Sequence, residues 1–211
     1  TVGPMRAGHA FVKVLRDRGM LEQATSLKIE LMGSLAATGK GHGTDTAAQL
    51  GLLGRIPETM DPDEVSVLIG DIRASRQLKL DGMHAVAFDP EADIAFHADK
   101  VPAFHTNAME FSVFAGDSLL YRRRYYSVGG GFIQWKGWEP PSLGEPVHRY
   151  SNMTELRAIV KEKGLNIYEI ILDNEMAITG ASRPSIIYSL NQIIDHMESS
   201  VRRGLDSEGQ L

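Results

Sequence analysis

The strongest constraint on the fold is the separation of strand-like from helix-like segments along the chain. Residues 83–133 contain several short runs rich in β-branched and aromatic side chains, which are typical of strands. Residues 151–203 instead combine helix-start residues with apolar side chains at helical spacing. Strands followed by helices, rather than a regular alternation of the two, indicate an α+β fold with a mixed or antiparallel sheet packed against helices.

The first 80 residues are expected to mix both kinds of element. Apolar residues at helical spacing predict a helix from Pro4 to the glycine at position 19, and a second helix over 46–53. Between them, 25–33 alternates apolar and polar side chains and predicts a half-buried strand. Helical spacing also predicts a helix over 61–81.

Turn and capping residues divide the rest of the chain. The residues Ala115–Ser118 predict a hairpin turn, and the prolines within 136–146 indicate a structural boundary. Helices are expected from Asn152 to Gly164, from Asn166 onward, and over 184–203. We therefore expect an α+β domain over residues 1–150, a helical segment over 151–203 and the start of a linker at 204–211. The expected strands are 86–88, 94–96, 109–114, 119–126 and 132–133.

Composition excludes several classes of protein. Hydrophobic residues make up 43% and charged residues 23% of the chain, as in soluble globular proteins. The net charge of −5 gives no basic field for nucleic acid, and no apolar run suits a membrane span. Without cysteine, the chain itself cannot hold a disulfide, a thiolate zinc site or a cysteine-ligated iron–sulfur cluster. The two ends predict a fragment of a longer cytoplasmic protein.

The most informative motif is the glycine-rich segment 38–45. Gly41 and Gly43 would let the backbone approach a ligand closely, and a helix capped by Thr44 or Asp45 would point its free N–H groups at an anion such as a substrate carboxylate. His42, held between the glycines, suits a general base, since imidazole exchanges protons near neutral pH. Spacing alone favours the simpler interpretation, a flexible strand-to-helix turn with an incidental histidine.

Two further segments are weaker candidates. His105 and Asn107 offer donors and acceptors to a small polar ligand, although an asparagine in a turn more commonly bonds to its own backbone. The triplet Gly129–Gly131 could form an anion-binding nest or, equally, a bulge or tight crossing. The remaining histidines lack the spacing of metal ligands, so no metal site is assigned: His9, His84, His97, His148 and His196.

The order of these motifs resembles the bacterial iron–sulfur L-serine dehydratases. The similarity spans nearly the whole chain and corresponds to the N-terminal, or β, region of that family. That family carries a serine-rich stretch and a histidine directly before the segment that starts here at Thr1. The resemblance rests on residues 1–5, 33–45, 125–132, 173–175 and 203–209.

The resemblance implies a chemistry. These enzymes eliminate water from L-serine to give pyruvate and ammonia, with a [4Fe-4S] cluster acting on the hydroxyl and a base removing the α-proton. It implies that His42 is the base and that the cluster is held by cysteines outside this chain, in an α region encoded in cis or as a separate chain. This chain alone is then expected to be inactive, and the enzyme to be a homodimer. The residues implied to bind substrate are Gly41, Gly43, Thr44, Asp45, His105, Asn107 and Gly130.

A second similarity leaves another function open. The segment also resembles the allosteric substrate-binding domain of some D-3-phosphoglycerate dehydrogenases, an α+β unit that holds a small anion. On that interpretation the chain is a small-anion-binding regulatory module without catalytic activity of its own. The missing cysteines favour the regulatory interpretation for this chain in isolation, and the long dehydratase-like motifs favour the catalytic one.

Overall fold

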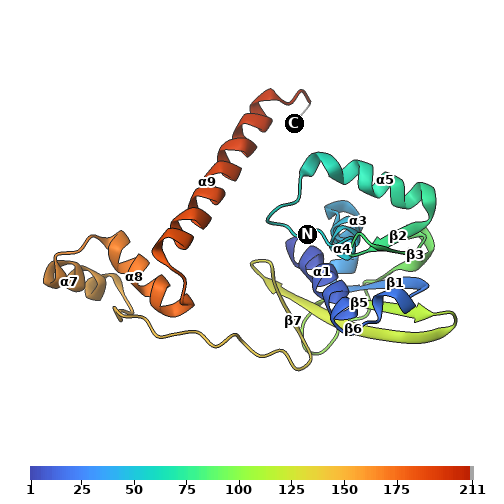
Figure 1. Ribbon diagram of the computed structural model, residues 1–211, viewed down its shortest axis with the longest axis horizontal. Helices are drawn as coiled ribbons and strands as arrows, with labels where there is room; N and C mark the ends of the chain where they lie inside the picture. The colour runs from blue at the N-terminus through green and yellow to red at the C-terminus, as the bar shows by residue number, and fades with distance from the viewer. Residues whose placement is uncertain (210–211) are drawn as a thin grey trace. The chain divides into compact units, whose positions relative to one another are not determined.

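The computed structural model describes residues 1–209, and the chain divides into two compact units, Thr1–Trp138 and Glu139–Leu211 (Figure 1). The division lies within the proline-containing stretch 136–146, twelve residues before the expected end of the first domain at residue 150.

A seven-stranded mixed sheet and the helices packed on it form the first unit, which confirms the α+β prediction. The central strand β1 runs parallel to β3 and β4 and antiparallel to β5. From β5 the sheet continues as an antiparallel meander through β6 to β7. The strands are β1 (Ser26–Gly33), β2 (Gln77–Leu80), β3 (His84–Ala87), β4 (Ile94–His97), β5 (Asn107–Ala115), β6 (Ser118–Gly129) and β7 (Phe132–Trp135).

The core lies between this sheet and α1 (Val2–Asp17). Leu27, Ile29 and Leu31 of β1 are fully buried, as the alternation in the sequence predicts, and Phe11 of α1 packs on the ring of Phe111. Figure 1 shows α1 and α4 on the same side of the sheet. The other helices of this unit are α2 (Ser34–Ala37), α3 (Gly39–His42), α4 (Thr44–Leu52), α5 (Val65–Ser75) and α6 (Pro90–Asp93), with 3₁₀ turns at Leu21–Gln23 and Pro62–Glu64.

The prediction of a helix over 61–81 is only partly correct. The helix α5 ends at Ser75, and Arg76 takes a left-handed conformation with φ 51°. Residues 77–80 then form β2, which pairs antiparallel with β3. Leu78 and Leu80 alternate with polar residues, so they fit a strand as well as the end of a helix, and pairing with β3 decides between the two.

Three helices make up the second unit: α7 (Met153–Lys163), α8 (Ile167–Thr179) and α9 (Arg183–Asp206). The side-chain oxygen Oδ1 of Asn152 caps α7 by accepting the Glu155 N–H at 3.0 Å. The Glu155 carboxylate accepts the N–H of Ser151 rather than that of Asn152, so the predicted capping box is shifted by one residue. Residues 204–206 of the expected linker belong to α9, and residues 210–211 lie outside the described part.

None of the helices within residues 1–209 combines the length and the hydrophobicity needed to span a bilayer.

Candidate functional site

The three sequence motifs meet at one end of the sheet. Strand β1 ends at Gly33, which pairs with Asn107 at the start of β5. Strand β6 ends at Gly129, which pairs with Phe132 at the start of β7. Because β1, β5, β6 and β7 are antiparallel in turn, the end of β1 and the end of β6 lie on the same side. The glycine-rich segment, the His105–Asn107 segment and the glycine triplet therefore all leave the sheet there.

The first turn of α1 lies at this same end. A Cβ atom on Gly3 would lie 2.3 Å from Ser127 Oγ, and one on Gly131 would lie 2.5 Å from the Val2 side chain. The guanidinium of Arg6 donates to the Gly131 carbonyl oxygen at 3.0 Å. On the other side, the Thr1 methyl group lies 4.0 Å from the Cβ position of Gly43. Residues 1–3 thus lie between the glycine-rich segment and the β6–β7 turn.

The glycine-rich segment is more regular than predicted. Its first part forms the one-turn helix α3, and Gly43, in a left-handed conformation, is the N-cap of α4 in place of the predicted Thr44 or Asp45. Tertiary packing explains the turn: a Cβ atom on Gly39 would lie only 3.0 Å from the Phe96 ring, over which the Lys40 ammonium also lies, 5.2 Å from its centroid.

The predicted base, His42, is exposed at the end of α3. Its imidazole forms no hydrogen bond or ion pair within residues 1–209, so both ring nitrogens are accessible to a solute. Gly41 is likewise exposed, Asp45 is half-buried and Thr44 is buried. Asp45 lies in the first turn of α4, where a carboxylate is favoured by the helix dipole and N–H groups lack intrahelical partners.

The segment His105–Asn107 is held by its own backbone and by β1. The Asn107 N–H donates to His105 Nδ1 at 3.1 Å, and a Cβ atom on Gly33 would lie 2.2 Å from the Thr106 carbonyl oxygen. His105 and Asn107 are half-buried. They lie at the same end of the sheet as His42, but no hydrogen bond between described residues joins them to it.

The glycine triplet forms a tight hairpin turn with a bulge, one of the two structures that its sequence allows. Gly129 pairs with Phe132, leaving a two-residue loop in which Gly130 and Gly131 have φ of 58° and 78°. The register shifts between Ser127 and Gly129, as at a bulge. Gly130, predicted to bind substrate, is exposed in this turn.

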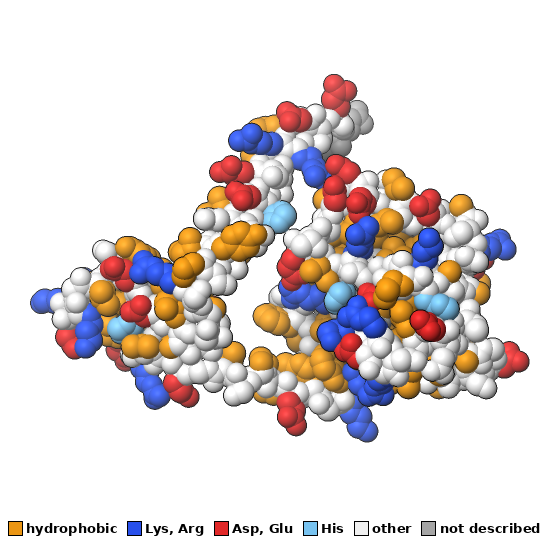
Figure 2. Space-filling model, viewed as in Figure 1, with side chains coloured by type: hydrophobic (Ala, Val, Ile, Leu, Met, Phe, Trp, Pro, Cys, Tyr) orange, Lys and Arg blue, Asp and Glu red, His pale blue; other side chains and the backbone are white. Residues whose placement is uncertain are grey.

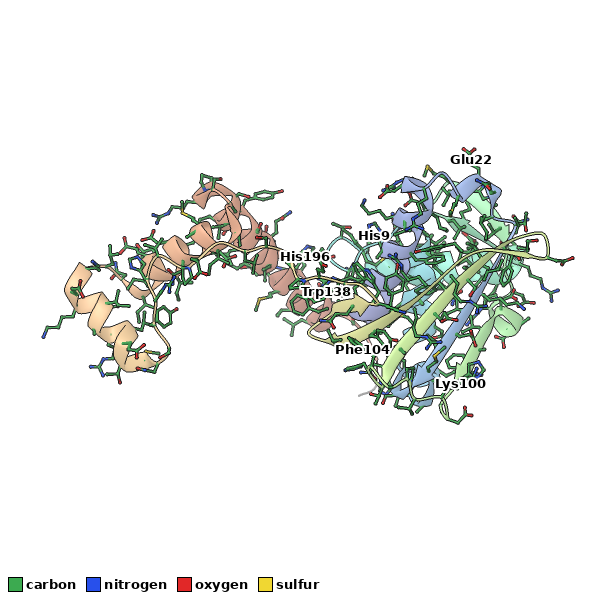
Figure 3. All side chains as sticks on the ribbon, turned by 90° about the horizontal axis from the view of Figure 1, so that it is seen from below. His9, Glu22, Lys100, Phe104, Trp138 and His196 are labelled. Carbon is green, nitrogen blue, oxygen red and sulfur yellow. The ribbon has the colours of Figure 1, made fainter. Side chains whose placement is uncertain are left out.

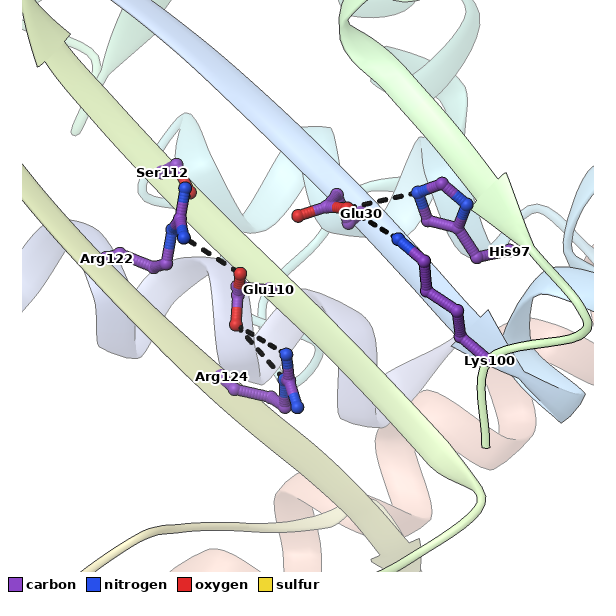
Figure 4. Close-up of polar contacts among 7 residues, drawn as sticks. All are labelled: Glu30, His97, Lys100, Glu110, Ser112, Arg122 and Arg124. Atoms are coloured by element: carbon purple, nitrogen blue, oxygen red, sulfur yellow. Dashed lines mark hydrogen bonds and ion pairs between the residues drawn. The ribbon is translucent and has the colours of Figure 1, made fainter. Parts of the chain in front are cut away.

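Sequence reasoning missed an ionic group beside the site. His97 Nε2 donates to Glu30 Oε1 at 3.0 Å, and the Lys100 ammonium lies 3.5 Å from the same oxygen (Figure 4). Burial would raise the pKa of Glu30, but the Lys100 charge and the hydrogen bonds from Lys100 and His97 outweigh it, and the pKa lies below its ordinary value. Parallel pairing of β1 with β4 brings these residues together, which no local spacing indicates.

A second ionic group lies on the same face of the sheet. The Glu110 side chain, only 9% exposed, lies 3.0 Å from Arg124 Nη2 and 3.4 Å from Arg122 Nε (Figure 4). Glu110 lies directly opposite Glu30 in the pairing of β1 with β5, where two unpaired carboxylates would repel each other. Each is neutralised by different cations, Lys100 for Glu30 and the two arginines for Glu110. Nearby, the ring of Phe104 packs on that of Tyr126, with centroids 4.7 Å apart. Figure 3 shows Phe104 and Lys100 on the side of this unit away from Glu22.

The described residues contain no group of three or more histidine, aspartate or glutamate side chains that could hold a metal ion. Histidines that the sequence left unassigned have other partners. His148 Nε2 lies 3.1 Å from Asp173 Oδ2, and its backbone N–H donates to Asn174 at 2.7 Å. His84 and His9 contact the carbonyl oxygens of Ala24 and Gly54.

Comparison with known proteins adds to this geometry. Residues 1–138 match the family described as the serine dehydratase beta chain. The chain is 35% identical to the Escherichia coli (strain K12) protein named L-serine dehydratase 2, over 100% of this chain and 47% of that protein. It is 36% identical to proteins named L-serine dehydratase from Streptomyces coelicolor and Mycobacterium tuberculosis, over 100% of this chain and 47% and 46% of theirs. The chain thus spans less than half the length of these relatives, and it belongs to the serine dehydratase beta chain family.

Proposed function

We propose that this chain supplies the general base and part of the substrate pocket of an enzyme that eliminates water from L-serine to give pyruvate and ammonia. The observation that carries the proposal is the family match over residues 1–138, which includes every predicted site residue. The arrangement of the sheet supports it, because the segments that bear these residues all leave the sheet at one end.

In the proposed reaction, the neutral imidazole of His42 takes the α-proton of L-serine, and the electron pair left on Cα forms the Cα–Cβ double bond as the Cβ–O bond breaks. The oxygen leaves as hydroxide, which takes up a proton to give water, and loss of the proton from the imidazolium restores the base. The resulting aminoacrylate tautomerises to an imine, which water hydrolyses to pyruvate and ammonia. An exposed imidazole without a hydrogen-bond partner among residues 1–209 is suited to this role, since it need not break another bond to accept the proton.

Substrate binding is assigned to the groups around His42. The N–H groups in the first turn of α4, at Thr44 and Asp45, suit the serine carboxylate. The N–H of Gly43 already donates to the Gly39 carbonyl oxygen, so Gly43 is assigned to the pocket through its backbone conformation and not as a donor. Gly41 leaves room beside the imidazole. His105, Asn107 and Gly130 complete the pocket in this proposal, from the other segments at the same end of the sheet.

This chain's own residues do not fit a [4Fe-4S] cluster. The sequence contains no cysteine, and residues 1–209 contain no cluster of other ligands. We propose that such a cluster is held by cysteines of an α region outside this chain, and that the assembled enzyme is a cytoplasmic homodimer. The relatives are about twice as long as their matched part, which leaves polypeptide for such a region.

A chimera tests this proposal. Residues 1–211 replace the matched part of the Escherichia coli protein named L-serine dehydratase 2, and pyruvate formation from L-serine is measured after anaerobic iron–sulfur reconstitution. We expect turnover by the chimera, none by this chain alone, and a fall in kcat of about 10²–10⁴-fold on His42→Ala. The matched control is His196→Ala, an exposed histidine on α9.

Two results would overturn the catalytic role. If the His42→Ala chimera kept its kcat and only raised KM, His42 would be a binding residue. If the chimera failed to turn over while this chain alone bound L-serine or another small anion at the glycine-rich segment, the chain would be a small-anion-binding regulatory module.

A further inference from the structure

The helix α9 carries an apolar stripe that the rest of its unit does not cover. Five apolar side chains follow one another at alternating spacings of three and four residues. This spacing is typical of a helix face that packs against another helix. No residue of α9 is buried, and these side chains are 39–64% exposed. Hydrophobic side chains are visible along part of α9 in Figure 2. The stripe consists of Ile187, Leu190, Ile194, Met197 and Val201.

The second unit has too little core to stabilise itself. Its buried hydrophobic side chains, within the described residues, are Leu156, Ile170 and Leu172. A unit of roughly 70 residues normally needs a well-packed core or additional covalent or metal links. Here α8 also exposes Ile167 and Ile171. Residues 139–209 therefore have the pattern of one layer of a larger helical domain.

The shape and charge of the stripe argue against a second copy of α9 as its cover. Isoleucines at 186 and 193 widen the stripe on one side, as in a helix that faces a globular core rather than a two-stranded seam. In a parallel pair of α9 helices, the flanking positions would also bring together no opposite charges. Those flanking residues are Ile186, Ile193 and Ser200 on one side and Asn191, Glu198 and Leu205 on the other.

We infer that the α9 stripe packs against helices of the polypeptide that the L-serine dehydratase relatives carry outside their matched region. The matched region is 47% of the Escherichia coli relative, so that protein has more than enough additional chain to cover one helix face. On this inference, residues 139–209 form the first helices of that second domain. The inference concerns packing and does not depend on His42 or on turnover.

The chimera described above tests it by a structural readout. Leu190→Glu combined with Ile194→Glu is placed in the chimera and in residues 1–211 alone. The matched control is Gln192→Glu with Ser199→Glu, on the opposite face of α9. We expect the stripe variant to lower the Tm of the chimera by about 5 °C or more and to leave that of the isolated chain unchanged. The control should change neither.

Amide hydrogen exchange gives the second readout. Exchange within α9 should be at least ~10-fold slower in the wild-type chimera than in the isolated chain, and the stripe variant should remove that protection. Three results would overturn the inference: a wild-type chimera that does not fold, a stripe variant as stable as the control, or an isolated chain whose α9 is already protected in a dimer. The last result would assign the stripe to a second copy.

Discussion

Gly3 in α1 packs directly against Ser127 in β6, and a Cβ atom at residue 3 would lie 2.3 Å from Ser127 Oγ and 2.9 Å from Ser127 Cβ. This contact holds the first turn of α1 to the end of β6, beside the β6–β7 turn. Residues 1–3 reach their place between the two glycine-containing segments because residue 3 has no side chain.

Substituting Gly3→Ala should therefore destabilise the first unit. We expect a loss of about 1–3 kcal/mol in the free energy of unfolding, measured with urea, because the added methyl group overpacks the contact. Ser127→Gly in the same chain should restore part of that loss. The control is Gly70→Ala on α5, where a Cβ atom meets nothing within 4 Å and alanine should be neutral or stabilising. Equal losses at residues 3 and 70 would contradict the packing argument.

In the β6–β7 turn, glycine is favoured by the backbone conformation rather than by close packing alone. Gly130 has φ 58°, and a Cβ atom there would lie 3.2 Å from the Phe132 ring. Gly130→Ala should cost about 1–2 kcal/mol in unfolding free energy, since alanine rarely takes this conformation. Gly130→Asn should cost less, because asparagine tolerates positive φ in this type of two-residue turn. Thermal unfolding of the two variants and the wild type measures these losses. Equal losses for alanine and asparagine would argue against backbone strain at residue 130.

Much of the fold could be predicted from local pattern. Alternation predicts the strand over 25–33 and turn residues predict the hairpin at Ala115–Ser118, and the structure confirms both. The error at 77–80 has a physical cause. Arg76 ends α5 with a positive φ, although no glycine or proline in the sequence marks the end of a helix there. Residues 77–80 form a strand because they pair with β3, a contact that the local sequence does not indicate.

The sequence predicts which residues form the candidate site, and those residues remain a prediction, but it does not predict what surrounds them. A glycine-rich segment after a strand favours His42 as a candidate base. The helical turn at Gly39–His42, however, depends on packing against Phe96, about 55 positions along the chain. The Glu30–His97 pair depends in the same way on β1 lying beside β4. Such contacts follow from the pairing of distant strands, which a single sequence does not specify.

The Glu30–His97–Lys100 group should make stability depend on pH. The pKa of Glu30 is lower in the folded chain than its ordinary 4.5, so the ionised carboxylate favours folding. That contribution is complete above the unfolded pKa and is lost as pH falls through the folded pKa. Lys100→Gln should therefore lower the unfolding free energy at pH 7 by under about 1 kcal/mol, since Lys100 is half-exposed, and the difference should shrink below about pH 4.

Urea unfolding of wild type and Lys100→Gln between pH 3 and pH 8 measures this difference. Lys136→Gln is the control, because Lys136 is an exposed lysine without an ion-pair partner within the described residues. A difference that stayed constant down to pH 3 would show that Lys100 acts through its aliphatic packing rather than through the Glu30 charge.

His105 should act as a positioning residue rather than as a base. Its Nδ1 accepts the Asn107 N–H at 3.1 Å, at the point where β5 begins opposite Gly33. His105→Ala leaves that N–H without its partner and should cost about 0.5–1.5 kcal/mol of stability. In the chimera it should raise KM for L-serine several-fold while kcat stays within a few-fold of wild type.

The informative variant is His105→Asn. An asparagine side chain commonly accepts the N–H of the residue two positions later, so it can replace the imidazole at Asn107 without supplying a base. We therefore expect His105→Asn to restore most of the Tm and of the KM of the wild-type chimera. At position 42, by contrast, an asparagine should not restore kcat, because it cannot take up a proton at neutral pH. If His105→Asn recovered the Tm but left kcat reduced by 10²-fold or more, the magnitude expected for a lost base, proton transfer would have to be reassigned from His42 to His105.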